Sequence, residues 1–224
     1  MKRVSEKKPV IAIIGGTGKE GPGLAMRWAQ AGYSVIIGSR QQEKARHTAE
    51  MINEKLGLDT VRGEVNAEAV KACNIAVLTV VQSAHQAALE SIKAVFDGQI
   101  LVDATARVDF RNPKPPEPPA AARKAQNILG DKAVVVGAFQ NVPAHALKKH
   151  LDKPLDAHVL VCSDDKKAAE AVIRLATDGG MQAYYAGCLD NAIIAEGMTA
   201  VLISMNKYYG VKTASVRIAG LEQA

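Results

Sequence analysis

Three glycines with the spacing of a phosphate-binding loop lie near the start of the chain. Residues 15–21 read GGTGKEG, so Gly16, Gly18 and Gly21 match the pattern G-x-G-x-x-G. In this pattern the first glycine permits a tight turn, the second lets the backbone approach a pyrophosphate, and the third lets the next helix pack closely. The pyrophosphate then binds at the positive end of that helix. Because an apolar run precedes the loop and a helical pattern follows, the motif favours dinucleotide binding over a structural glycine turn.

A second group of polar residues indicates which dinucleotide. An NAD-binding enzyme usually carries Asp or Glu at the end of the second strand, where the carboxylate binds the ribose hydroxyls. This chain has Ser39 and Arg40 there, and Lys44 follows one helical turn later. A guanidinium, an ammonium and a hydroxyl suit a 2′-phosphate, which a carboxylate would repel. The alternative is that the two cations are merely solvated, with Lys44 paired to a neighbouring glutamate. We favour NADP(H).

The rest of the chain offers few groups for acid–base or nucleophilic catalysis. Tyr208 and Tyr209 come too late for a Tyr-x-x-x-Lys motif. His85 and His145 follow predicted strands and are candidates for substrate contact, although a lone histidine is more often structural. The other histidines, His47, His150 and His158, resemble surface or packing residues. A hydride acceptor that requires no proton chemistry from the protein would explain this scarcity, because orientation and proximity would then supply most of the acceleration.

Composition excludes several other classes of protein. Aromatic residues make up only 4 % of the chain and the net charge is +5, which argues against a nucleic-acid surface but suits an anionic small molecule. The three cysteines are far apart and lie in apolar stretches, so we expect buried free thiols rather than a metal site. We expect a cytoplasmic protein whose residues 1–8 form a flexible basic extension.

Apolar runs and helical patterns alternate along the whole sequence. This rhythm predicts an α/β protein with a Rossmann-type, doubly wound parallel sheet over residues 9–144 and a small C-terminal α/β domain over 145–224. The long apolar helix at the end is expected to be buried, at a dimer interface. Strands are expected over residues 10–16, 34–40, 60–65, 75–81, 100–105, 132–139, 158–164 and 182–187, and helices over 21–32, 41–57, 67–73, 85–96, 120–129, 166–180 and 191–210.

One segment interrupts this alternation. Residues 111–119 read RNPKPPEPP and contain five prolines, which predicts an extended surface loop. Because the strand–helix rhythm continues after it, we interpret the segment as a loop over the carboxyl edge of the sheet rather than a domain linker. Its function, centred on residues 112–119, is left open by the sequence.

With these motifs in place, the chain resembles the NADPH-dependent reductases of coenzyme F420, an 8-hydroxy-5-deazaflavin. The resemblance covers nearly the whole chain and is carried by residues 11–45, 73–80, 134–147, 159–165 and 186–210. The turn AFQNVPA and the final segment AGCLDN with its long helix are its most specific parts. Archaeal members carry His where this chain has Gln140, Pro-Trp where it has Val81-Gln82, and Ser-Arg where it has Ala192-Ile193.

The resemblance implies reversible hydride transfer between NADP(H) and F420 in a homodimer, with no residue acting as acid or base. It places the NADP phosphate at Thr17, Ser39, Arg40 and Lys44, and the deazaflavin at residues 140–143. The full set of candidate cofactor-binding residues is Gly16, Thr17, Gly18, Lys19, Glu20, Gly21, Ser39, Arg40, Lys44, Thr79, Val80, Val81, His85, Ala104, Gln140, Asn141, Val142 and Pro143. No catalytic residue or metal site is expected.

Two other functions fit the same residues. An NADPH-dependent reductase of a small carbonyl or imine would use the same fold and depend on His85 or His145. A non-catalytic NADP-binding sensor would need no acid–base residue at all, and its C-terminal helix would signal cofactor occupancy to a partner.

Overall fold

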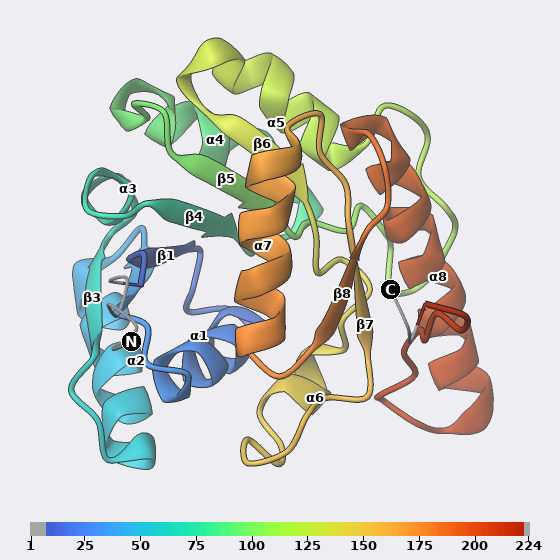
Figure 1. The fold of residues 1–224 in the computed structure, drawn as a ribbon, viewed down its shortest axis with the longest axis horizontal. Helices are drawn as coiled ribbons and strands as arrows, with labels where there is room; N and C mark the ends of the chain where they lie inside the picture. Colours follow the sequence, from blue (N-terminus) through green and yellow to red (C-terminus); the bar gives the residue numbers. More distant parts are fainter. Residues whose placement is uncertain (1–7, 222–224) are drawn as a thin grey trace, which may run out of the picture.

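A six-stranded parallel sheet forms the centre of the molecule in the computed structural model, which describes residues 8–221 (Figure 1). Its strands are rich in β-branched residues and are buried on both faces, as parallel strands between two helical layers must be. Their spatial order is β3-β2-β1-β4-β5-β6, which confirms the predicted Rossmann-type topology. The strands are β1 Ile11–Ile14, β2 Val35–Ser39, β3 Val61–Val65, β4 Ile75–Leu78, β5 Ile100–Asp103 and β6 Val134–Gly137.

Helices cover both faces of this sheet, and each face has its own apolar cluster. One cluster joins alternate strand residues to α1 Gly21–Gln30, α2 Gln42–Leu56 and α7 Lys166–Asp178. The other cluster joins the opposite strand residues to α3 Asn66–Lys71, α4 His85–Ile92 and α5 Ala121–Leu129. The predicted helices and strands are therefore confirmed, with ends that differ by a few residues. Four short 3₁₀ turns adjoin helices within residues 8–221: η1 Gln82–Ala84, η2 Lys93–Val95, η3 Gly130–Lys132 and η4 Leu189–Asn191.

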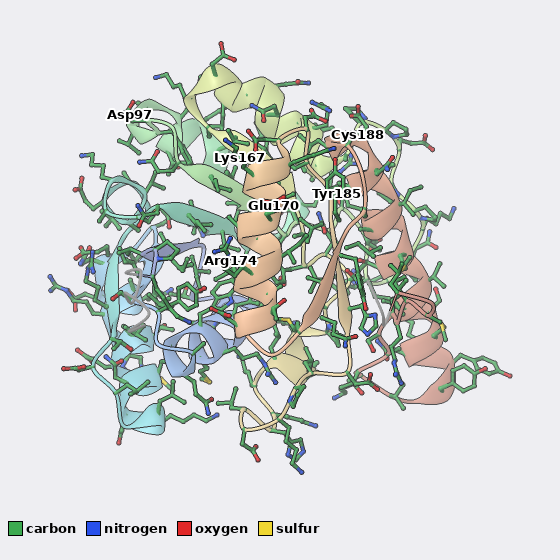
Figure 2. All side chains as sticks on the ribbon, in the orientation of Figure 1. Asp97, Lys167, Glu170, Arg174, Tyr185 and Cys188 are labelled. Carbon is green, nitrogen blue, oxygen red and sulfur yellow. The ribbon has the colours of Figure 1, made fainter. Side chains whose placement is uncertain are left out.

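The C-terminal part is closely integrated with the Rossmann part. It contains α6 Ala144–Leu147, a two-stranded parallel sheet of β7 His158–Val161 and β8 Gln182–Tyr185, and α8 Ala192–Tyr209. An antiparallel bridge between Gly137 and Cys162 links β6 to the end of β7. The inner face of α7 packs beside α1, whereas its outer face carries Lys167, Glu170 and Arg174 toward solvent (Figure 2). One apolar cluster thus spans both sides of the predicted domain boundary at residues 144 and 145.

Polar contacts of α1 strengthen this connection. Arg27 is buried without a carboxylate partner among the described residues, and its guanidinium donates to the carbonyls of Leu147, Lys149, Lys153 and Gly179. The indole Nε1 of Trp28 donates to the carbonyl of Leu175 at 3.0 Å. Arg27 and Trp28 therefore hold the C-terminal part against the first helix of the Rossmann unit.

The predicted basic extension lies outside the described residues except for Lys8. The ammonium of Lys8 pairs with Asp178 at 2.8 Å, donates to the carbonyl of Ala31 and lies 4.4 Å from the ring centroid of Tyr33. Lys8 thus joins the β1 end of the chain to the end of α7. Of the helices over residues 8–221, none combines the length and the apolar character that a bilayer span needs.

The sequence predicted that the helix α8 is buried at a dimer interface, and the single chain covers only part of it. Its buried residues are Ala192, Ala195, Glu196, Ala200 and Leu202, and several of its other large apolar residues point to solvent. The exposed fractions are 63 % for Ile194, 54 % for Val201, 43 % for Met205 and 83 % for Tyr208. In the single chain α8 is therefore buried on one side only, because small side chains bring that side close to the core.

Candidate functional site

The glycine loop between β1 and α1 has the geometry that the motif predicts. A Cβ on Gly16 would lie 2.7 Å from the carbonyl oxygen of Ile13, and one on Gly21 would lie 2.6 Å from the Cα of Gly16. Both glycines are therefore required by the fold itself. A Cβ on Gly18 would meet the carbonyl oxygens of Gly15 at 3.4 Å and Thr79 at 3.8 Å, both ordinary contact distances. Gly18 is exposed, so the space in front of it is open to a ligand.

The other residues of the loop differ in their surroundings. Thr17 is half-buried and Lys19 is exposed. Glu20 caps α1, and its Oε1 is buried with no hydrogen-bond partner. Burial raises the pKa of the Glu20 carboxyl to about 8. At neutral pH this side chain is therefore mostly protonated, and a neutral carboxyl does not repel an anion bound at the loop.

The end of β2 presents two unpaired cations. Arg40 and Lys44 are exposed, and neither forms an ion pair within residues 8–221. The neighbouring Glu43 pairs with Arg46 instead, at 3.8 Å, so the alternative of a Lys44–glutamate pair is not what the structure shows. Ser39 is buried, and its Oγ accepts a hydrogen bond from the backbone N–H of Gln41.

The end of β4 lies directly against the glycine loop. The backbone N–H of Thr79 donates to the carbonyl of Ile14 at 3.0 Å, and the Thr79 hydroxyl donates to the same oxygen. The Cγ1 of Val80 occupies the space where a side chain on Gly15 would project. Val81 is exposed. These residues line the loop on its β4 side.

Buried polar groups gather beyond β4 and β5. The ring Nε2 of His85 lies 2.6 Å from Oδ2 of Asp103, and both side chains are almost completely buried. The other carboxylate oxygen of Asp103 accepts from the backbone N–H of Thr105 at 2.9 Å. The Nε2 of Gln140 donates to the carbonyl of Asp103 at 3.0 Å. The start of α4 and the turn after β6 are thus both tied to Asp103 at the end of β5, one through its carboxylate and the other through its backbone carbonyl.

The turn after β6 presents polar atoms without partners. Phe139 adopts a φ of 72° and Val142 N–H donates back to its carbonyl, which closes the turn. The amide groups of Gln140 and Asn141 each donate to a backbone carbonyl, so their oxygens are left over. Gln140 Oε1, Asn141 Oδ1 and the nearby Thr105 hydroxyl are buried and have no hydrogen-bond partner among residues 8–221. Ala104 and Val142 are buried apolar neighbours, and Pro143 caps α6.

A buried ion pair fastens the proline-rich loop to α8. Arg107 Nε lies 2.9 Å from the Glu196 carboxylate, whose other oxygen accepts from the backbone N–H of Ala121. Arg107 also donates to the carbonyl of Glu117. Glu196 therefore holds both ends of the loop, which runs beside α8 in Figure 1. Burial raises the pKa of the Glu196 carboxyl, an effect that the Ala121 N–H and Arg107 oppose.

All the predicted site residues lie at the carboxyl ends of parallel strands, and hence at one edge of the sheet. The strand order reverses between β1 and β4, and a dinucleotide crosses a Rossmann sheet at this switch point. Sequence reasoning missed Asp103, Thr105, Arg107 and Glu196. The position of Asp103 at the end of a buried strand was the one available signal, whereas Arg107 and Glu196 are 89 residues apart. The described residues contain no cluster of three metal-binding side chains.

Comparison with known proteins adds sequence evidence to this geometry. Residues 10–107 match the family model described as NADP oxidoreductase coenzyme F420-dependent. The F420-dependent NADP reductase of Methanothermobacter thermautotrophicus is 38 % identical over 95 % of this chain and 96 % of its own length. That of Methanocaldococcus jannaschii is 36 % identical over 95 % of this chain and 99 % of its own length. The chain belongs to the F420-dependent NADP reductase family.

Solved structures agree with the fold of an F420-dependent NADP reductase. A candidate F420-dependent NADP reductase from Arthrobacter sp. FB24 superposes with a TM-score of 0.76 at 24 % identity, covering 94 % of this chain and 99 % of that chain. An imine reductase from Myxococcus stipitatus superposes with a TM-score of 0.56 at 17 % identity, covering 91 % and 61 %. At these identities the likeness supports the fold alone.

Proposed function

We propose that the protein transfers a hydride reversibly between NADP(H) and the deazaflavin coenzyme F420. The observation that carries this proposal is the identity of 36–38 % to F420-dependent NADP reductases over 95 % of the chain. Such similarity includes both the glycine loop at residues 15–21 and the turn at 139–143, which lie on opposite sides of the switch point.

The residues present fit an NADP molecule. The open space at Gly18 suits the pyrophosphate, and the unpaired cations Arg40 and Lys44 suit a 2′-phosphate. Ser39 and Thr17 complete the proposed phosphate contacts, and Lys19, Glu20, Thr79, Val80 and Val81 line the proposed path to the other side of the switch point. The remaining half of NADP would then lie over β4, β5 and β6.

The residues beyond β6 fit a second heterocycle. Gln140 Oε1, Asn141 Oδ1 and the Thr105 hydroxyl are buried polar atoms without partners, which is costly unless a ligand satisfies them. We propose that residues 140–143 contact the deazaflavin, with Ala104 as an apolar neighbour. The contribution of the protein to hydride transfer is then orientation and proximity, because the two rings react directly when held face to face.

We also propose that the protein forms a homodimer through α8. Its exposed apolar residues Ile194, Val201, Met205 and Tyr208, with the half-buried Met198 between them, follow the alternating spacing of four and three residues that pairs helices. A monomer rarely leaves such a stripe in water, and family resemblance implies a dimer. Sedimentation of the wild type and of Val201→Glu tests the dimer: we expect the variant to be monomeric. Separately, we propose that the enzyme is cytoplasmic, as the sequence analysis expects.

Optical spectroscopy tests the activity. Protein, NADPH and oxidised F420 are mixed, and the loss of the deazaflavin band is followed together with NADPH oxidation. We expect both signals to change together, and the reaction to reverse when NADP⁺ and reduced F420 are supplied. Absence of turnover from acid to mildly alkaline pH would reject the proposal. Turnover of a carbonyl or imine with F420 inert would favour the reductase alternative, and NADPH binding without any turnover would favour the sensor.

A further inference from the structure

The His85–Asp103 pair has the geometry of an oriented acid–base group. Asp103 is fixed on both carboxylate oxygens, by the ring of His85 at 2.6 Å and by the N–H of Thr105 at 2.9 Å. A carboxylate can only accept, so the Nε2 of His85 carries the proton of that hydrogen bond. The other ring nitrogen, Nδ1, is then the atom that can exchange a proton with a ligand.

The position of Nδ1 suits this exchange. Within residues 8–221 the His85 ring makes no hydrogen bond besides the one to Asp103, and Nδ1 is not one of the buried polar atoms without a partner. This nitrogen therefore retains contact with the solvent side of the pair. His85 begins α4, directly after the β4 loop, and so lies on the far side of the switch point from Arg40.

Most of the other charged groups around the pair are engaged in ion pairs over residues 8–221, and Lys93 and Lys124 are exceptions. Glu196, which interacts electrostatically with Asp103, is held by Arg107. On the helices packed against α4, Glu68 and Lys71 of α3 pair with each other, and Arg123 of α5 pairs with Asp164 and Asp190. Lys93 follows α4, and Lys124 lies on α5. Asp103 is the one carboxylate among the described residues that contacts the His85 ring.

We propose that His85 donates and recovers the proton of the reaction, with Asp103 as its positioning residue. The inference rests on the proposed function, in which NADPH, F420 and one proton give NADP⁺ and reduced F420. The hydride leaves NADPH with both electrons and forms a C–H bond on the deazaflavin. The proton leaves His85 Nδ1, forms an N–H bond on the same fused ring system, and is replaced from solvent. This role departs from the expectation that no side chain exchanges a proton.

A glutamine substitution separates this role from a structural one. The side-chain amide of glutamine reaches about as far as the Nε2 of histidine, so His85→Gln retains a donor for Asp103 but cannot carry a proton to a ligand. His150→Asn serves as the control, because His150 is exposed, has a φ of 46° that asparagine tolerates, and lies outside the proposed site. Thermal unfolding and NADPH titration of both variants confirm that fold and cofactor binding are retained.

The experiment measures turnover against pH in both directions, the solvent isotope effect in D₂O, and the NMR signals of the His85 ring on addition of NADPH and F420. We expect F420 reduction, which consumes a proton, to slow as the pH rises, and F420 oxidation, which releases one, to show the opposite trend. His85→Gln should lose about 100-fold in turnover together with this pH dependence. His150→Asn should retain both, and the His85 ring signals should shift when the cofactors bind.

The outcomes separate the two proposals. An inactive wild type would reject the proposed function and this inference with it. An active wild type with an unchanged rate and pH profile in His85→Gln would overturn the inference alone. If the variant fails to fold, the same measurements on the wild type still test the inference. A flat pH profile, the absence of a solvent isotope effect or an unperturbed His85 ring signal would each contradict a proton-donating His85.

Discussion

Arg40 gives the clearest test of cofactor choice, because its side chain has no partner within the described part of the chain. Replacing it by alanine removes no contact that stabilises the fold, so the free energy of unfolding should stay within about 0.5 kcal/mol of the wild type. If the guanidinium binds the 2′-phosphate, the substitution removes charge-assisted hydrogen bonds worth about 1.5–3 kcal/mol. The affinity for NADPH should then fall roughly 10- to 150-fold.

The assay is a fluorescence titration of NADPH and of NADH into the wild type, Arg40→Ala and Arg46→Ala. Arg46 lies on α2, which begins two residues after Arg40, and forms only a long, exposed ion pair with Glu43, so its removal is the matched control. We expect Arg40→Ala to weaken NADPH binding while NADH binding stays the same, and Arg46→Ala to change neither. Equal losses for the two cofactors, or no loss for NADPH, would refute the assignment of Arg40 to the phosphate.

Three further substitutions test other parts of the site. Gly18→Ala should leave stability unchanged or raise it by up to about 1 kcal/mol, because its Cβ would meet the carbonyls of Gly15 and Thr79 at the ordinary distances of 3.4 and 3.8 Å; titration should show NADPH affinity reduced by about tenfold or more, since the methyl enters the ligand's space. Glu196→Ala leaves Arg107 buried without its counter-charge and should lower the free energy of unfolding in urea by about 3–5 kcal/mol. Because burial raises the pKa of Glu20 from 4.5 to about 8, the wild type should lose stability as the pH rises from 4.5 to about 8 and level off above that pH, and its NADPH affinity should decline as the carboxyl ionises near pH 8; Glu20→Gln should show neither decline, and identical pH profiles would contradict this.

The sheet and the glycine loop could be predicted because both depend on local sequence. Short β-branched runs bounded by glycine encode buried parallel strands, and the spacing of Gly16, Gly18 and Gly21 encodes the turn. To propose Ser39, Arg40 and Lys44 as phosphate ligands, it was enough to locate the end of the second strand in the sequence. The structure adds that Gly16 and Gly21 are required by packing, whereas Gly18 is not, a distinction that spacing alone does not contain.

The hydrogen-bonded contacts of Asp103 with His85 and Gln140 could not be predicted, because these residues meet only after the chain has folded. Asp103 is 18 residues from His85 and 37 from Gln140, and the strand order alone brings their backbones together. The side of α8 that faces the core could not be predicted for a related reason. A helix that is apolar on most sides does not reveal which side faces the core, and here three alanines and Leu202 pack inward while Ile194, Val201 and Met205 face solvent in the single chain.

The two halves of the proposed site differ in how much the fold depends on them. On the β2 side, Arg40 and Lys44 are exposed and form no ion pair within residues 8–221. Substitutions at these positions should therefore change ligand binding without changing the stability of the fold. On the β5 side, His85 and Asp103 are buried and hydrogen-bonded to each other, and Asp103 also accepts from the backbone N–H of Thr105, so a change there alters both chemistry and packing. Loss of activity after a change on the β2 side therefore reports on binding, whereas a change on the β5 side requires an isosteric variant, such as His85→Gln, before any loss can be assigned to proton transfer.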